Sequence, residues 1–463
     1  MADDSKMPII AFNLLPRIAQ QFLNKDLKKT DQGYSDIVSG RYITLFFSIG
    51  TLLIVFVWVS RLYGSMSALI ATFMLSFCPN NLAAASLVTT DSYSVFILTL
   101  ILFLLWNWLQ KGSLKHFIFL SVAIAIAQVI KQSLFHLYIL VPVLLLVFYI
   151  VNRPQIRISK LLFFLGVFTF IQLIIINSVY FFSGSFSTIG SYQFVSHGFK
   201  NIQQLMPVNL PVPLPSPFVQ GLDFAIYVND IGGGVNGVSG FGKITILGNE
   251  ATQGRFWYYY LVSLLFKTPI TCILLFLFAI MRLLKSQQRK QFFKNEWLLL
   301  GTFIYFFTYF SFFYKTQIGI RQIIFLYPIM FILSVSFVSS IRSGFQKYLL
   351  GILLIYQAVS VLTYAKNYYP YTNEFIVDKK MAYAVVGAAN LEFGQGAYFA
   401  TNYLKNNAGV SFPKETPQNG VFLVSTSDYL DIWNIKKYSW LQKYKPFDHV
   451  AYNWLLIRVA DLP

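Results

Sequence analysis

The chain has 463 residues, of which 56% are hydrophobic and only 12% are charged. This composition excludes an ordinary soluble enzyme and indicates a protein that crosses a membrane several times. The formal net charge of +18 does not indicate nucleic-acid binding, because the Lys and Arg residues lie in short loops between apolar runs, where they set topology. The two cysteines and four histidines are too scattered to predict a disulfide framework or a histidine metal site.

Ten membrane-spanning helices are predicted from the apolar runs, each end uncertain by several residues. They cover residues 42–60, 64–85, 91–109, 115–131, 134–151, 160–182, 256–281, 296–314, 322–341 and 347–365. Loops rich in Lys and Arg alternate along the chain with loops that contain few of them. The positive-inside rule places the loops rich in Lys and Arg in the cytoplasm. The other loops face outside.

The predicted order of regions follows from these spans. Residues 1–41 form an interfacial segment at the outer face, and transmembrane helices follow over 42–182. A long extracytoplasmic loop over 183–255 leads to further transmembrane helices over 256–365 and to an extracytoplasmic C-terminal region over 366–463. The Pro- and Gly-rich loop is interpreted as a flexible lid, with direct contact to a ligand as the alternative. In the tail, residues 396–407 predict a short helix, and 420–425 and 454–459 predict strands. The fold class is therefore an all-α polytopic membrane protein with a small α/β region outside.

The start of the chain conflicts with this topology. Lys25, Lys28, Lys29 and Arg41 precede the first span, and only Arg61 follows it closely. These charges alone favour an N-terminus inside, whereas every later loop requires it outside. We therefore expect a further helix upstream of Met1 that delivers residues 1–40 to the outer side.

Asp91 stands at the start of an apolar run that ends near Trp108. One interpretation is that Asp91 only caps the N-terminus of a helix. The other is that it caps the helix and is also an active-site acid. Cations also fall near predicted outer edges, namely Lys6, Lys131, Arg255, Lys267, Lys315 and Arg321. An ion-coupled transporter more often holds its ionisable residues at mid-membrane, so this distribution favours an enzyme acting at the membrane surface.

Several short strings occur together in a characteristic order. They are Asp4-Ser-Lys6-Met-Pro8, Thr89-Thr-Asp91, Trp257-Tyr-Tyr-Tyr260, Lys267-Thr-Pro269, Gly319-Ile-Arg321, Tyr371-Thr-Asn373-Glu374 and Asn390-Leu-Glu-Phe-Gly394-Gln395. The set resembles the polyprenyl-phosphate-sugar-dependent transferases of the C-type (GT-C) glycosyltransferase superfamily. The branch is that of protein O-mannosyltransferases and lipid A aminoarabinose transferases (glycosyltransferase family 39), and the resemblance extends over nearly the whole chain.

The resemblance implies roles for individual residues. Asp91 and Asp4 are the candidate catalytic acids, because the family's usual first helix and acidic pair would lie upstream of Met1. Lys6, Arg321 and Lys267 are the candidates for binding the donor phosphate, and a structural role is the alternative for Lys267. The family's tail motif usually has Asp and Trp where this chain has Glu392 and Phe393.

The implied reaction moves a sugar, such as mannose, from a polyprenyl phosphate to an acceptor hydroxyl or amine on a protein, a lipid or another glycan. A carboxylate would take the acceptor proton, while cations would stabilise the leaving phosphate. No cofactor is expected, and no pattern supports a divalent metal. The expected location is the inner membrane, with membrane lipids as neighbours and the active site facing the periplasm. The alternatives are a transporter or flippase for a lipid-linked saccharide, and an inactive truncated homologue.

Overall fold

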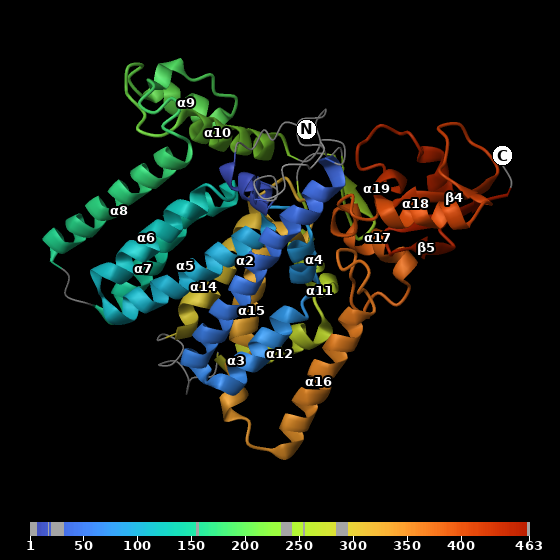
Figure 1. Ribbon diagram of the computed structural model, residues 1–463, viewed down its shortest axis with the longest axis horizontal. Helices are drawn as coiled ribbons and strands as arrows, with labels where there is room; N and C mark the ends of the chain where they lie inside the picture. Colours follow the sequence, from blue (N-terminus) through green and yellow to red (C-terminus); the bar gives the residue numbers. More distant parts are fainter. Residues whose placement is uncertain are drawn as a thin grey trace.

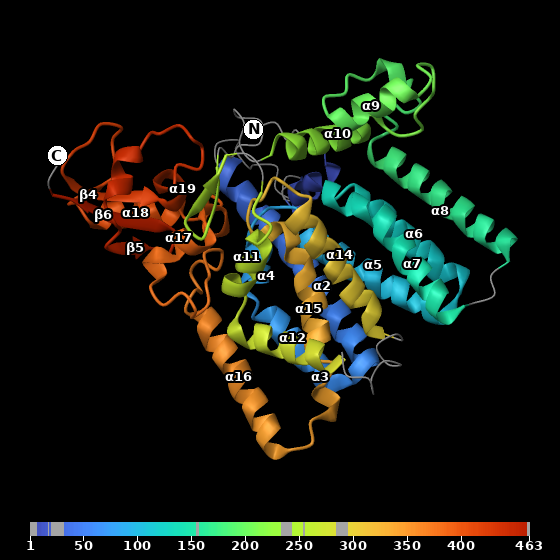
Figure 2. The same ribbon diagram turned by 180° about the vertical axis from the view of Figure 1, so that it is seen from behind.

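The computed structural model describes residues 7–16, 18–19, 32–153, 157–232, 243–252, 255–283 and 295–460. The chain forms a helical body with a smaller α/β region beside one end (Figure 1). The helices α9 (His197–Leu205) and α10 (Ser216–Ile231) lie toward this same end, and α3 (Ser65–Ser76) lies toward the other. Figure 2 shows the same separation from behind. The described segments that the charge pattern assigns to the outer side therefore share one end of the molecule.

The helical body is built from apolar helices. Besides α3 they are α2 (Gln32–Tyr63), α4 (Pro79–Ser86), α5 (Asp91–Lys111), α6 (Leu114–Gln128), α7 (Leu137–Asn152), α8 (Ile158–Val179), α11 (Tyr259–Lys267), α12 (Ile270–Leu283), α14 (Trp297–Phe312), α15 (Tyr327–Ser334) and α16 (Gly344–Leu362). Each of the ten predicted runs contains helix. Among the described residues, six segments are long and apolar enough to cross a membrane, or eight if two bent pairs each form one span. The predicted all-α polytopic class is confirmed.

Proline accounts for the two bends. Cys78 and Thr268 each precede a proline, and both have extended backbones, with φ/ψ of −93°/114° and −105°/136°. A residue before proline disfavours the helical conformation, so a new helix starts at or just after the proline. The pair α3 and α4 is bent by 61°, and the pair α11 and α12 by 117°. Hydropathy does not register a bend and predicts one span for each pair.

The centre of the body lies where α5 meets the segment from Ile320 to Ser340. The helix α5 packs against α2 and α6, and also against the 3₁₀ helix η7 (Ile320–Leu326). In the apolar window of 320–340, 83% of the residues are buried, against 17% in α8. The second value is typical of a helix whose sides face lipid. The start of α5 and the start of η7 are thus held within the protein.

The region predicted as a long irregular loop contains more regular structure than its composition suggests. Besides α9 and α10, it forms a hairpin of β1 (Ile244–Ile246) and β2 (Asn249–Ala251). Asp223 in α10 accepts hydrogen bonds from the backbone N–H groups of Val195 (2.8 Å) and Ser196 (2.9 Å), which joins α10 to the start of α9. Most of the Gly-rich run interpreted as a lid, 233–242, lies outside the described residues.

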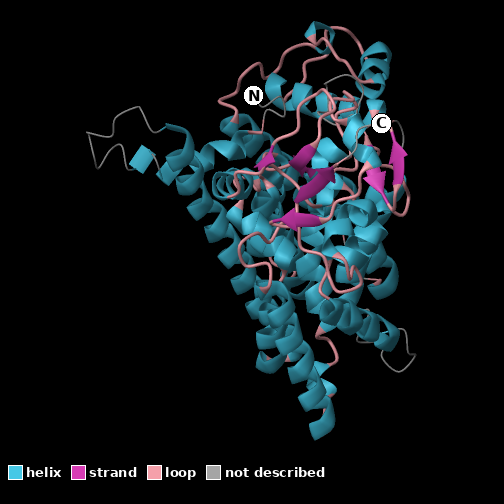
Figure 3. Cartoon of the chain, turned by 90° about the vertical axis from the view of Figure 1, so that its right-hand side faces the viewer, coloured by secondary structure: helices cyan, strands magenta, loops and turns pink. Residues whose placement is uncertain are grey.

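The C-terminal region contains the predicted small α/β unit (Figure 3). Its sheet has the order β3-β4-β6-β5, in which β4 and β6 are antiparallel and β3 is parallel to β4. The strands are β3 (Val410–Ser411), β4 (Gly420–Ser425), β5 (Asp448–Val450) and β6 (Trp454–Val459). The helices are α17 (Ala382–Val386), α18 (Ala397–Asn406) and α19 (Thr426–Tyr429). Ala400 and Leu404 of α18 pack against Leu423 and Leu456 on one face of the sheet. The small C-terminal α/β region is confirmed.

Candidate active site

Asp91 is the first residue of α5, and its carboxylate is nearly buried, with 6% of the side chain exposed. The residue before it, Thr90, makes no side-chain capping bond. Thr89 Oγ1 donates instead to Asp91 Oδ2 at 3.1 Å. The carboxylate does more than cap the helix, because both of its oxygens also contact cations from other elements.

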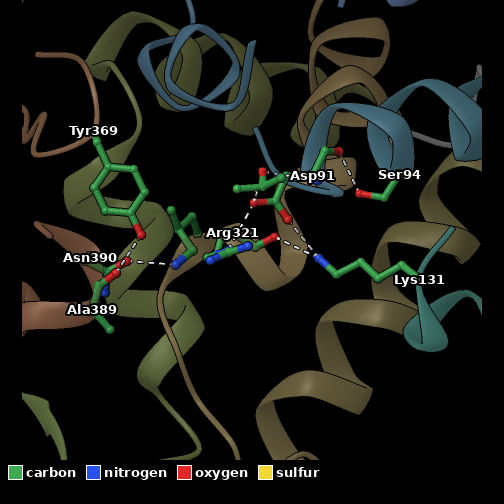
Figure 4. A network of polar contacts seen from close by, with 9 residues as sticks. Asp91, Ser94, Lys131, Arg321, Tyr369, Ala389 and Asn390 are labelled. Carbon is green, nitrogen blue, oxygen red and sulfur yellow. Dashed lines mark hydrogen bonds and ion pairs between the residues drawn. The ribbon is translucent and has the colours of Figure 1, made fainter. Parts of the chain in front are cut away.

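Two cations flank the Asp91 carboxylate (Figure 4). Lys131 Nζ lies 3.0 Å from Oδ1, and Arg321 Nε lies 3.0 Å from Oδ2. The two cationic side chains are 13% and 16% exposed. We call Asp91, Lys131 and Arg321 the charged cluster. It has one negative and two positive charges, so its net charge of +1 favours binding of an anion.

Lys131 reaches the charged cluster because the chain is extended between α6 and the 3₁₀ helix η3 (Gln132–His136). Its φ/ψ of −154°/130° breaks the helical path at this residue. Burial lowers the pKa of the Lys131 ammonium. The nearby Asp91 carboxylate opposes that shift, and the positive Arg321 adds to it. The Asp91 contact therefore favours the charged form of an ammonium that burial disfavours.

Arg321 is positioned by a tight approach between η7 and the C-terminal region. Gly319 precedes η7 with a φ of +89°, and a Cβ placed on it would lie 2.5 Å from the carbonyl oxygen of Ala389. The backbone N–H of Ile320 donates to Asn390 Oδ1 at 2.8 Å. Glycine is therefore required at 319, and Asn390 of the tail motif fixes the turn that presents Arg321.

Aromatic rings from the C-terminal region cover the arginine. The guanidinium carbon of Arg321 lies 4.0 Å from the centre of the Phe393 ring. Phe393 in turn stacks on Tyr369, with ring centres 6.1 Å apart, and the Tyr369 hydroxyl donates to the carbonyl of Ala389 at 2.9 Å. Phe393 thus supplies a flat aromatic surface against the guanidinium.

Lys267 is not part of the charged cluster. The residue is 1% exposed, and its ammonium donates to the backbone carbonyls of Tyr369 and Asn390, the latter at 2.6 Å. The side chain ties α11 to the two C-terminal segments that contact Arg321. This geometry is that of a structural tie, and a role for Lys267 in binding phosphate stays a prediction.

The remaining predicted site residues, Asp4 and Lys6, lie outside the described residues. Within the described ranges, no group of three or more His, Cys, Asp or Glu side chains is placed to hold a metal ion. Sequence reasoning did not include Lys131, Asn390 or Phe393 among the site residues. In the sequence, Lys131 is only one of several cations near a predicted outer edge, and no motif around it indicates contact with Asp91.

Fold and charges together define a multi-pass membrane protein with an anion-attracting cluster enclosed between its helices and its C-terminal region. Residues 34–180 match the family model described as dolichyl-phosphate-mannose-protein mannosyltransferase. Over these residues, which are less than half of the chain, the match confirms the resemblance to glycosyltransferases of the GT-C superfamily.

Two solved structures are also similar to the chain. They are crystal structures of ArnT from Cupriavidus metallidurans, one in the apo state and one bound to undecaprenyl phosphate. Both are 11% identical to this chain, with a TM-score of 0.48. The apo alignment covers 96% of this chain and 86% of that one, and the other covers 97% and 88%. A comparison with curated proteins gives no match.

Proposed function

We propose that the chain is a membrane glycosyltransferase that takes a sugar from a polyprenyl-phosphate donor and transfers it to an acceptor at the outer face of the inner membrane. The observation that carries the proposal is the charged cluster, in which one carboxylate holds two cations with a net charge of +1. The family match over 34–180, which contains Asp91 and Lys131, supports the reaction class. Mannose is the proposed sugar, on the strength of that family description.

In the proposed reaction, an acceptor oxygen or nitrogen forms a bond to the anomeric carbon of the sugar. The bond from that carbon to the phosphate oxygen breaks, and the polyprenyl phosphate leaves with an additional negative charge. Arg321 and Lys131 stabilise this charge, Arg321 through the guanidinium N–H groups that do not face Asp91. The burial of all three side chains makes these interactions stronger than they would be in water.

The acceptor proton requires a base. Asp91 already accepts from Lys131, Arg321 and Thr89, so in this arrangement its carboxylate orients the two cations. Asp4 remains the other predicted acid. Which carboxylate takes the proton is decided by substitution: loss of the base lowers the rate of transfer at saturating donor, whereas loss of a positioning residue mainly weakens donor binding.

The experiment uses the full chain in phospholipid nanodiscs with radiolabelled mannosyl-phosphoryl-undecaprenol. Labelled mannose should move to an acceptor fraction, and Arg321→Gln and Lys131→Met should each weaken donor binding on the order of ten-fold or more, the loss of one charge-assisted contact. Lys437→Ala is the matched control, because Lys437 is largely exposed. Donor flux across vesicles without transfer would instead identify a transporter or flippase and overturn the proposal.

A further inference from the structure

A separate cavity lies between the end of α16 and the C-terminal region. Its volume is about 610 Å³, within the usual range of small-molecule sites. It is lined by residues around 362–367, by one face of α18 and by the end of β5 with the turn that follows it. No member of the charged cluster lines it, so the cavity is distinct from the candidate active site.

One wall is a polar and aromatic face of α18. Its members recur at helical spacing on one side of the helix: Phe399, Asn402, Tyr403 and Asn406. The residue that follows the helix, Asn407, extends the same wall. Ala400 and Leu404 pack on the sheet, so most of this face does not belong to the core. Within the described part of the chain, the amides of Asn402 and Asn406 have no hydrogen-bond partner. Both residues line the cavity and are exposed, so two carboxamides four residues apart are available to a ligand there.

The opposite wall is a row of three rings. Tyr364 stacks on Tyr452 with ring centres 4.1 Å apart and planes inclined by 28°. Tyr452 in turn lies 4.7 Å from the ring of His449. Asn367 holds this wall together, because its Nδ2 donates to the carbonyl of Ala451 at 3.1 Å. The described lining includes Lys366 but no Asp or Glu.

We propose that this cavity binds a saccharide. Phe399 and His449, both half-buried in the lining, offer apolar ring surfaces that match the C–H faces of a pyranose. Each carboxamide both donates and accepts, as a sugar hydroxyl does. An acyl chain would leave the two partnerless amides without hydrogen bonds when they are covered, at a free-energy cost that a saccharide avoids. The absence of carboxylates from the described lining disfavours a cationic ligand.

This inference rests on the proposed function in one respect: the saccharide is assigned to the acceptor. Both cavity walls continue directly into the segments that hold Arg321. Asn367 lies two residues before Tyr369, and α18 begins four residues after Phe393. A sugar bound in the cavity is thus held by the same segments that position the cluster. The acceptor is accordingly a glycan or glycolipid rather than an unmodified protein.

The test is direct binding to the full chain in phosphatidylcholine nanodiscs, which avoids sugar-based detergents. Saturation-transfer NMR with mannobiose, chitobiose and lactose should show transfer to the ring protons of at least one of them. The double variant Asn402→Ala/Asn406→Ala should raise its Kd roughly ten-fold, the equivalent of two neutral hydrogen bonds. Lys405→Ala is the matched control, because Lys405 lies on the same helix but does not line the cavity.

The double variant should keep the thermal stability of the wild type, since neither amide bonds to a described residue. Absence of binding to all three saccharides, or equal binding by the double variant, would overturn the saccharide assignment even if sugar transfer from the donor is observed. Binding that depends on the two amides in a protein that transfers no sugar would keep the saccharide site. It would overturn the acceptor role together with the proposed function.

Discussion

Asp91→Asn removes the only negative charge of the charged cluster. At 3.0 Å and an effective dielectric constant of about 20, each ion pair contributes a Coulomb attraction of about 5.5 kcal/mol before desolvation is subtracted. The substitution also relieves the desolvation of the carboxylate itself. It leaves Lys131 and Arg321 buried, close together and without their counterion. Breaking a buried pair from one side in this way costs about 3–5 kcal/mol of folding free energy.

A double variant separates this charge effect from any loss of packing. Asp91→Asn/Lys131→Met removes one cation as well, so a single cation, that of Arg321, remains in the cluster. We expect the double variant to be more stable than Asp91→Asn alone, although it departs further from the native sequence. The assay is thermal unfolding of the purified protein in nanodiscs, followed by intrinsic fluorescence.

Asp378→Asn provides the control for this comparison. Asp378 forms a 3.5 Å pair with Lys380 in which the two side chains are 52% and 35% exposed. An exposed pair of this kind contributes at most about 1 kcal/mol, so the melting temperature should hardly change. The reasoning is refuted if Asp91→Asn unfolds at the wild-type temperature, or if the double variant is less stable than the single one.

Three further outcomes are expected. Gly319→Ala should abolish sugar transfer and lower the melting temperature, because residue 319 has a positive φ and its Cβ would meet the Ala389 carbonyl; wild-type transfer would contradict this. Lys267→Met should lower the melting temperature, because two backbone carbonyls lose their donor; a weaker donor Kd at an unchanged melting temperature would instead favour the predicted phosphate contact. Burial raises the pKa of Glu392, opposed by hydrogen bonds from Ser427 and Thr426. The stability contributed by a group with a raised pKa is lost as pH rises through that pKa. The melting temperature of Glu392→Gln should therefore exceed that of the wild type by more at pH 8 than at pH 4.

Much of the membrane body can be predicted from hydropathy and charge, because the apolar runs and the basic loops are local features of the sequence. The strands 420–425 and 454–459 coincide with β4 and β6, and the helix expected over 396–407 is α18 at Ala397–Asn406. The bends at Pro79 and Pro269 were outside the reach of hydropathy, since the apolar run continues through them. The order within 183–255 was missed for a related reason. It depends on contacts such as that of Asp223 with Ser196, which no local pattern reveals.

The candidate site could be predicted only in part. Motifs predict Asp91 and Arg321 as site residues, and the structure brings them together. Their chemical roles remain predictions. Lys131 is separated from Asp91 by 40 residues and from Arg321 by 190, and it carries no motif of its own. Lys131 becomes the second cation only because α6, which precedes it, packs beside α5. Lys267 is the opposite case. It belongs to a motif that is apparent in the sequence, but its ammonium binds backbone carbonyls and lies outside the charged cluster.

Phe393 lies outside the residues that match the family model, at a position where the resemblance implies tryptophan. A tail motif outside the membrane body could serve folding of the C-terminal region alone, and the exchange of tryptophan for phenylalanine could then be neutral. The structure places this ring 4.0 Å from the Arg321 guanidinium, and the neighbouring Asn390 holds the backbone of η7. The ring face that binds a guanidinium is present in both residues, so the exchange keeps the contact while reducing the aromatic area. The C-terminal region therefore completes the charged cluster rather than merely covering it, and the orientation of Arg321 depends on how that region docks against α11 and η7.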